Sequence, residues 1–267
     1  MAQVVERILG KDEVGGSSPP SSSKSKSIGL LFSFNQRKGR DFVKAELNII
    51  AHIHTDFSSK FGIPRQSGLV EELEATIVFE PEYRNPDALR GIEEYSHLWL
   101  IWEFSECVGK EWTPTVRPPR LGGNKRMGVF ATRSPFRPNP IGLSSVKLLG
   151  VEKSENYGCV LRVAGADLLD GTPIYDIKPY LAYVDSRPDA NSGFALDEKE
   201  GRLTVEFPDE LLKKIPAEKQ AALKAVLAQD PRPGYQHTPE RIYGIEFAGF
   251  DVRFRVDKSI LEVTEIA

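Results

Sequence analysis

The sequence has little cysteine, no long apolar run and almost no net charge. Its 267 residues include two cysteines, Cys107 and Cys159, which are too few for a disulfide framework and lack the CxxC spacing of a metal knuckle. No stretch approaches the ~18 consecutive apolar residues of a membrane helix, and the first residues lack the apolar core of a secretory signal. We therefore expect no membrane segment, cysteines that act as small hydrophobic residues, and a cytoplasmic location.

Sequence motifs of several enzyme classes are also missing. The chain has no G-x-G-x-x-G turn for a Rossmann dinucleotide fold, no P-loop, no H-E-x-x-H and no G-x-S-x-G. His52 and His54 could begin a metal site, but no third ligand is evident. The sequence therefore predicts neither a bound metal nor a Rossmann domain.

The charge is divided unevenly along the chain. With 35 Lys and Arg against 38 Asp and Glu, the net charge of −3 by itself argues against a nucleic-acid partner. Residues 112–151, here called the basic segment, nevertheless carry seven basic side chains and no acidic one, so removing this +7 leaves −10 elsewhere. Prolines and glycines stiffen and bend the segment, which indicates a surface for a phosphate-rich partner rather than a solvated face whose acids lie elsewhere in space. Its basic residues are Arg117, Arg120, Lys125, Arg126, Arg133, Arg137 and Lys147.

Hydrophobic alternation predicts a mostly β protein. In Glu72–Glu80 the apolar residues recur at a period of two, which is typical of a half-buried strand, and Leu98–Phe104 has the continuous apolar run of a central strand. Closely spaced strands with few helices between them favour a barrel or compact meander over βαβ units. Further strands are expected at Glu46–His54, Met127–Thr132, Leu143–Glu152 and Gly158–Val163, and a helical turn capped by Asn85 at Asn85–Gly91.

The composition divides the chain into three regions. Residues 1–45 are expected to form a disordered extension, because 10–27 are rich in Ser, Gly, Pro and Lys and offer almost nothing to bury; a misplaced start codon would explain them. Residues 46–195 are expected to form the barrel domain. Residues 200–267 are expected to form a small α+β domain, with a helical stretch at Asp209–Gln229 that Pro216 divides and short strands in Arg241–Glu265.

The segment Asp167–Tyr180 is a second region of interest. Asp170-Gly171 predicts a turn, after which a short strand would carry Asp176, Lys178 and Tyr180 on one face. Three polar, titratable side chains beside a turn are typical of a site. A surface ion pair between Asp176 and Lys178 explains the same spacing equally well.

Five segments in collinear order resemble one known family. They are FGIPRQSGLV (61–70), RGIEEYSHLWL (90–100), RPPRLGGNKRMGVFATRSPFRPNPIGLS (117–144), DLLDGTPIYDIKPY (167–180) and AQDPRPGYQ (228–236). Together they resemble the TsaA-like family, also called TrmO and formerly YaeB, over residues 46–267. The long central motif is far more specific than a short glycine-rich loop.

This resemblance implies a β-barrel tRNA methyltransferase that uses S-adenosyl-L-methionine and acts as a homodimer. In the family, the methyl group goes to N6 of N6-threonylcarbamoyladenosine, the base just 3′ of the anticodon (position 37) of threonine tRNA. Ser105-Glu106 departs from the family, many members of which have His-Gln there. The family's cofactor contacts carry over onto Arg65, Gln66, Arg133, Leu143, Leu168, Leu169, Asp170 and Gly171.

The chemistry of this reaction suggests further roles. The acceptor nitrogen is urea-like, so a base that removes its proton would help; Asp176 is our candidate, with Lys178 and Tyr180 orienting the base or the acceptor. The threonyl carboxylate suits an arginine fork from Arg133, Arg137 or Arg232. Phosphates of the tRNA would be held by Arg117, Arg120 and Arg126.

Two other functions stay open at this point. A non-catalytic RNA-binding barrel could stack bases on Trp99, Trp102 and Trp112, although core packing is the favoured use of the first two. A small-molecule methyltransferase could use the same cofactor loop without tRNA.

Overall fold

The computed structural model describes residues 45–267 except 122, 195–201, 233–237 and 239, and without the side chain of Arg120. The extension predicted at residues 1–45 lies outside the described residues, apart from Ala45. None of the helices in the described part of the chain is long and apolar enough to cross a bilayer.

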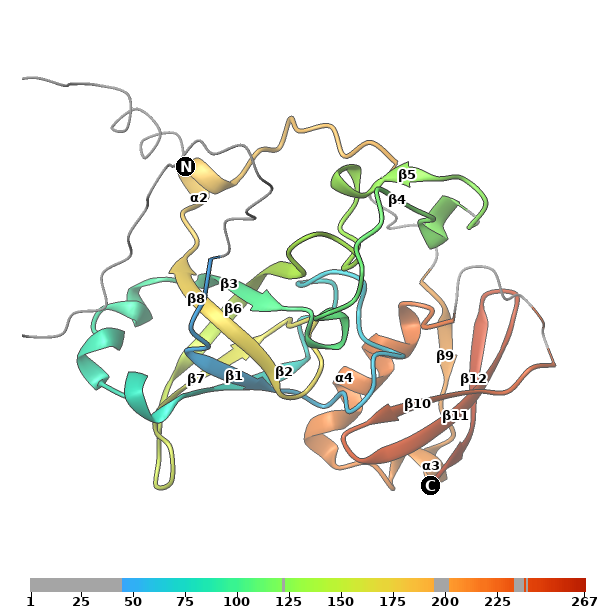
Figure 1. Cartoon of the computed structure of the whole chain (residues 1–267). Coiled ribbons are helices and arrows are strands. Elements are labelled where there is room, and N and C mark those ends of the chain that lie inside the picture. The colour runs from blue at the N-terminus through green and yellow to red at the C-terminus, as the bar shows by residue number, and fades with distance from the viewer. Residues whose placement is uncertain (1–44, 122, 195–201, 233–237, 239) are drawn as a thin grey trace, which may run out of the picture. The chain divides into compact units, whose positions relative to one another are not determined.

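Six antiparallel strands close into a barrel (Figure 1). The order around it is β1-β2-β7-β6-β3-β8, and the ring closes because β8 pairs with β3 on one side and with β1 on the other. The prediction of a mostly β fold without a Rossmann domain is thus confirmed. The strands are β1 (Ala51–His54), β2 (Glu74–Phe79), β3 (His97–Glu103), β6 (Ile141–Ser154), β7 (Gly158–Ala164) and β8 (Thr172–Pro179).

Alternating side chains fill the barrel interior. In β2 the alternation read from the sequence is confirmed, because Ala75, Ile77 and Phe79 are buried. In β3, Leu98, Leu100 and Trp102 point inward. The same alternation puts Trp99 on the outer face, so the expectation that it packs in the core was wrong.

Short helices flank the strands. The turn expected at Asn85–Gly91 is a 3₁₀ helix, Pro86–Leu89, and Asn85 caps it by accepting the Asp87 N–H at 3.0 Å. Helix α2 (Ala182–Asp185) had no sequence signal; Asp185 accepts hydrogen bonds from the backbone N–H of Leu181 and the indole of Trp99 at 2.9 Å. The remaining 3₁₀ helices are Pro81–Tyr83, Ile92–Glu94, Ser105–Cys107, Pro119–Leu121 and Val129–Ala131.

The strand predicted at Met127–Thr132 was wrong over most of its length. Only Met127–Gly128 (β5) pairs, with β4 (Thr115–Val116), before the chain turns into the 3₁₀ helix Val129–Ala131. This turn buries Val129, and the hydroxyl of Thr132 closes it by donating to the Val129 carbonyl at 2.8 Å. The β4–β5 pairing therefore ends where the chain turns to bury Val129.

The carboxy-terminal residues form a four-stranded sheet with two helices. The sheet order is β10-β11-β12-β9, and Pro216 separates α3 (Asp209–Leu212) from α4 (Ala217–Ala228) as predicted. The parallel strand β9 (Thr204–Glu206) was not expected. The three expected strands are β10 (Tyr243–Phe247), β11 (Phe250–Asp257) and β12 (Ile260–Ile266).

The segment after β1 joins the two hydrophobic cores. Phe57 packs edge-on against Phe247 of β10, with ring centroids 5.6 Å apart, inside the core of the carboxy-terminal sheet. Asp56 pairs with Lys219 of α4 at 2.7 Å, and its carbonyl accepts the Ala248 N–H at 2.8 Å. Residues 55–58 therefore connect the barrel to the carboxy-terminal residues.

Gly142 of β6 provides a test of the barrel packing. A Cβ at this position would lie 2.2 Å from the indole of Trp102, whereas a Cβ at Gly128 would meet nothing within 4 Å. We predict that Gly142→Ala lowers the free energy of unfolding by about 1–3 kcal/mol, the usual cost of overpacking. Gly128→Ala, whose φ of −58° suits any residue, is the matched control in a urea titration. Equal stability of the two variants would contradict the packing described.

Candidate functional site

Segment 90–100 begins at one end of the barrel, and segments 61–70, 117–144 and 167–180 meet at the other. This end, here called the site end, is formed by the last residues of β1 and β3 and the first residues of β2, β6 and β8. The loop before β2, the part of the basic segment just before β6 and the connection from β7 to β8 all lead into it (Figure 1). Closure of the ring thus brings together residues more than a hundred positions apart.

The loop 61–70 lies along the edge of β6. The N–H of Ser145 donates to the hydroxyl of Ser67 at 3.1 Å, and the N–H of Gly68 donates to the Gly165 carbonyl at 2.8 Å. Gly165 has a positive φ of 76°, and a Cβ there would lie 3.3 Å from the backbone of Gly68. The close approach therefore depends on glycine.

Gln66 and Arg133 are in direct contact at this end. The guanidinium of Arg133 donates to the side-chain oxygen of Gln66. Leu143 lies on β6, and β3 separates it from β8. Its side chain is on the outer face of the barrel and is 56% exposed. Three of the positions implied as cofactor contacts are thus brought to neighbouring elements.

A buried polar chain runs beneath these residues. The indole N–H of Trp102 donates to the Ser144 hydroxyl at 3.0 Å, which donates to the Asp167 carboxylate at 2.6 Å. Burial raises the pKa of Asp167, while hydrogen bonds from Ser144 and from backbone N–H groups and the charge of Arg133 act in the opposite direction. This carboxyl group lies where the loop 61–70, β6 and the basic segment converge.

The turn 168–171 is held by the end of β1. The N–H of Asp170 donates to the Phe57 carbonyl at 2.8 Å, the N–H of Thr55 donates to the Asp170 carboxylate at 3.0 Å, and the Thr55 hydroxyl donates to the Leu168 carbonyl at 3.1 Å. The Leu168 side chain is buried in the barrel core, and the hydroxyl of Thr172 donates a hydrogen bond to the Leu169 carbonyl. Gly171 has a φ of 73°, which the turn requires.

Asp176, Lys178 and Tyr180 gather on the outer face of the barrel. Asp176 and Lys178 form an ion pair at 2.8 Å, and Tyr180, just past the end of β8, places its ring 5.4 Å from that of Trp99. Asp176, Ile101 and Leu143 are cross-strand neighbours in β8, β3 and β6. At the usual strand spacing, Asp176 and Leu143 are therefore about 10 Å apart. The ion pair considered from the sequence exists, and a catalytic role for Asp176 stays a prediction.

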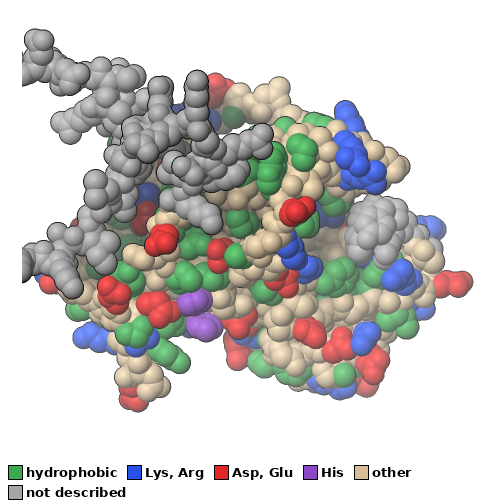
Figure 2. Space-filling view, viewed as in Figure 1, with side chains coloured by type: hydrophobic (Ala, Val, Ile, Leu, Met, Phe, Trp, Pro, Cys, Tyr) green, Lys and Arg blue, Asp and Glu red, His purple; other side chains and the backbone are tan. Residues whose placement is uncertain are grey.

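The arginines assigned to tRNA have different surroundings. Arg117 is exposed, Arg126 donates to the Thr115 hydroxyl at 3.1 Å, and Arg137 donates to the Thr132 carbonyl at 3.1 Å. The side chain of Arg120 lies outside the described residues. Figure 2 shows Lys and Arg side chains gathered on the face that carries β4 and β5.

Arg232 is the most enclosed of these arginines. Only 8% of its side chain is exposed, and its Nε and a terminal nitrogen each donate to the Asp230 carboxylate at 2.8 Å. Burial opposes ionisation of Asp230, but the hydrogen bonds and charge of Arg232, aided by Arg65, lower the pKa of Asp230. Arg232 thus lies near the loop 61–70, with part of its donor set already used.

Two exposed aromatic rings accompany the basic segment. Trp112 and Phe130 stack with centroids 6.4 Å apart at 21°, and both remain well exposed. An exposed aromatic pair among arginines suits unpaired bases.

The histidines pair with acids rather than form a metal site. His52 contacts Glu80 at 2.8 Å and His54 contacts Asp170 at 3.3 Å. Among the residues that the structure describes, no group of three or more His, Cys, Asp or Glu could hold a metal ion. Cys107 and Cys159 are free and half-buried.

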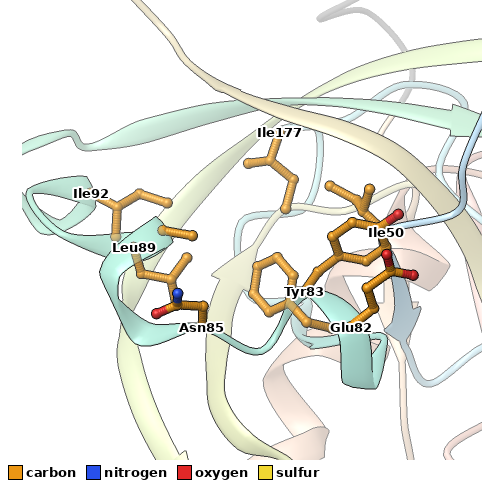
Figure 3. Close-up of a pocket in the computed structure, with 9 residues that line it drawn as sticks. Ile50, Glu82, Tyr83, Asn85, Leu89, Ile92 and Ile177 are labelled. Carbon is orange, nitrogen blue, oxygen red and sulfur yellow. The ribbon is translucent and has the colours of Figure 1, made fainter. Parts of the chain in front are cut away.

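A mostly apolar pocket lies at the opposite end of the barrel. Figure 3 shows it between Ile50, Ile177 and the short helices around Tyr83 and Leu89; its volume is about 320 Å³. None of the residues implied as cofactor or substrate contacts lines it, so it is separate from the site end.

The site end suits S-adenosyl-L-methionine chemically. Its arginine side chains suit the carboxylate of the cofactor, and its carboxylates suit the positively charged groups. The exposed apolar side chain of Leu143 suits the adenine ring. Burial raises the pKa of the Asp167 carboxyl. Carboxyl groups with shifted pKa values are common at functional sites and are not needed for packing.

The structural class of this protein is thus a closed antiparallel barrel that carries a polar, arginine-bearing site at one end. Residues 52–186 match the tRNA-methyltransferase O N-terminal domain and residues 200–267 match the TrmO C-terminal domain. The chain therefore belongs to the TrmO family, as its motifs indicated.

Relatives and solved structures agree with this membership. The chain is 43% identical over 222 residues, 80% of its length and 94% of the relative's, to the tRNA (adenine(37)-N6)-methyltransferase of Escherichia coli (strain K12). A relative from Pseudomonas aeruginosa, 39% identical over 82% of this chain and 96% of its own, has a provisional name as an S-adenosylmethionine-dependent methyltransferase. The crystal structure of TrmO from Pseudomonas aeruginosa superposes with a TM-score of 0.67 at 32% identity, covering 84% of this chain and all of that one.

Sequence reasoning did not find Ser67, Ser144 and Asp167. Each lies next to a position that the family motifs highlighted, and Asp167 begins the D-L-L-D-G turn itself. A buried serine and a half-buried aspartate have no periodic signature, so only the folded contacts reveal them.

Tyr175 gives a measurable check of the outer face of β8. Its hydroxyl donates to Glu103 of β3, and burial together with this acid raises the pKa of Tyr175 to about 12. We predict that Glu103→Gln lowers this pKa only part of the way back towards ~10, because burial is the larger cause and remains. Ultraviolet titration of tyrosinate, with Tyr175→Phe to identify its signal, measures the shift. An unchanged pKa in Glu103→Gln would contradict the contact.

Proposed function

We propose that this protein is an S-adenosyl-L-methionine-dependent tRNA methyltransferase that acts on N6 of the adenine at position 37. The observation that carries the proposal is the family match across both parts of the chain, with a relative of that name at 43% identity. The convergence of segments 61–70, 117–144 and 167–180 at the site end supports it. Loss of the methylated nucleoside from the tRNA of a deletion strain, detected by mass spectrometry, tests it.

The substrate we propose is N6-threonylcarbamoyladenosine in threonine tRNA. Its threonyl carboxylate suits an arginine fork, for which Arg133 is exposed at the site end. Arg137 donates to carbonyls of its own loop, and Arg232 is bound to Asp230. Arg133 is therefore the best placed of the three. A cytoplasmic location, where tRNA is available, and the homodimer that the family resemblance implies are also part of the proposal.

Cofactor binding is assigned to the site end. Arg65, Gln66, Arg133 and Leu143 would contact S-adenosyl-L-methionine with side chains, and the turn of Leu168, Leu169, Asp170 and Gly171 would line the site. When bound, this cofactor supplies a methyl group already activated by a sulfonium. The residues of the chain then have to bind, orient and exclude water.

Proton removal is the remaining chemical step. The threonylcarbamoylated nitrogen has a delocalised lone pair, so a carboxylate that accepts its N–H proton during methyl transfer would lower the barrier. Asp176 would accept that proton, Lys178 would hold the carboxylate in place through their ion pair, and Tyr180 would orient the acceptor against Trp99.

An RNA-binding protein without catalysis is the second candidate function. The exposed Trp112–Phe130 pair favours it, because stacking on unpaired bases needs no cofactor. Calorimetry with S-adenosyl-L-methionine separates the two, and methylation of free nucleosides without tRNA would instead indicate a small-molecule methyltransferase.

The role of Asp176 can be tested in single turnovers. We predict that Asp176→Ala lowers the rate of methyl transfer by about 10²–10⁴-fold, the usual contribution of a general base, while the affinity for the cofactor stays nearly unchanged. Rapid-quench assays with saturating cofactor and modified tRNA measure it. Asp87→Ala, on a 3₁₀ helix at the opposite barrel end, is the control. A rate equal to that of the unaltered protein would remove Asp176 as the base.

The basic segment can be tested by salt dependence. We predict that Arg117→Ala reduces the slope of log affinity for tRNA against log salt by ~0.7–0.9, the loss of one phosphate contact. The matched control is Arg90→Ala, an exposed arginine outside the basic segment that pairs with Asp87. Filter binding over a range of KCl concentrations gives both slopes. If the two variants share the slope of the unaltered protein, Arg117 does not contact the backbone.

A further inference from the structure

Asp167 connects the three segments of the site end. Its carboxylate accepts the Ser144 hydroxyl at 2.6 Å. The backbone of Ser67 and the charge of Arg133 both act to lower its pKa, so both are near it. These partners come from β6, from the loop 61–70 and from the basic segment. No other carboxylate among the described residues shares this set of partners.

Each partner adjoins a residue that we assign to cofactor binding. Ser67 follows Gln66, Ser144 follows Leu143, and Arg133 contacts Gln66 directly. A change at Asp167 would therefore displace all three segments at once. The other acids near the site end have different partners: Asp170 is bound to the end of β1, and Glu106 pairs with Lys60.

The contact with Ser144 is fixed from behind. Trp102, which is nearly buried, donates to the Ser144 hydroxyl, so this hydroxyl uses its own hydrogen to bind Asp167. Trp102 is itself confined against Gly142. The Trp102–Ser144–Asp167 chain thus holds the carboxylate in one place.

Stability does not account for a carboxylate at this position. Burial raises the pKa of Asp167, so the ionised form costs folding free energy at neutral pH compared with a neutral group of the same shape. An asparagine could still accept from Ser144 and Ser67. It would lack the negative charge near Arg133 and would carry an NH₂ donor in place of the second carboxylate oxygen.

We propose that Asp167 is the positioning residue of the cofactor site. Its negative charge holds Arg133, Gln66 and the Leu143–Ser144 edge of β6 in the arrangement that binds S-adenosyl-L-methionine. This inference rests on the proposed function. It assigns no contact between Asp167 and the methyl group.

The first test separates the charge of Asp167 from its shape. Asp167→Asn should bind S-adenosyl-L-methionine roughly tenfold more weakly, as expected when a charge-assisted interaction is lost. Its Tm at neutral pH should equal or exceed that of the unaltered protein. Calorimetry and differential scanning on the full chain measure the two, and Asp87→Asn, at the opposite barrel end, is the matched control for both.

The second test uses pH. As pH falls through the raised pKa of Asp167, the carboxylate gains a proton and Arg133 loses its counter-charge, so cofactor affinity should fall. In Ser144→Ala a hydrogen bond that lowers this pKa is missing, and the loss of affinity should begin at a higher pH. In Asp167→Asn the loss of cofactor affinity at low pH should disappear. Among the described residues, Arg133 is the charged group that lowers the pKa of this carboxyl.

The outcomes distinguish this inference from the function on which it rests. If the unaltered protein does not bind S-adenosyl-L-methionine, the proposed function itself is overturned. If it binds but Asp167→Asn retains the loss of affinity at low pH, or loses Tm in parallel with affinity, Asp167 has a structural role only and the inference is wrong.

Discussion

Closure of the barrel by β8 is the constraint on which the candidate site depends. Because β8 pairs with both β1 and β3, the turn before it is held against the end of β1, while its outward side chains lie beside those of β3. The loop 61–70 then lies along the edge of β6 and brings Ser67 to Ser145. One set of backbone ladders thus assembles segments that are far apart in the sequence.

The segment after β1 extends this constraint to the carboxy-terminal residues. Thr55 binds the turn 168–171, while the neighbouring Asp56 and Phe57 bind α4 and β10. Three consecutive residues therefore contact the turn 168–171 on one side and the carboxy-terminal core on the other. The charge of Arg65 helps to lower the pKa of Asp230, which is paired with Arg232. The Asp230–Arg232 pair is therefore a second carboxy-terminal element near the loop 61–70. The carboxy-terminal residues support the site as well as packing against the barrel.

The polarised charge has a structural counterpart. Prolines and glycines keep much of the basic segment before β6 out of regular strands, so Arg117 and Arg133 remain exposed while Arg137 ties the loop to itself. Before β6, burial of Val129 in a 3₁₀ turn ends the short β4–β5 ladder. A loop held in this way presents guanidinium groups with little ordering still to be done, which favours binding of an anionic partner.

The sequence by itself determined the β periodicity of β2 and β3, the division of the helix at Pro216, the charge of the basic segment and the family. Each of these is local or is carried by contiguous motifs, so neighbouring residues suffice to reveal it. Only the tertiary structure decided that Trp99 lies outside the barrel, that Val129 turns into a 3₁₀ helix, and that Asp167 joins Ser67, Ser144 and Arg133. These features depend on which side chains the closed ring leaves room to bury and which distant polar groups it brings within hydrogen-bonding distance, and neither is encoded in any short stretch of chain.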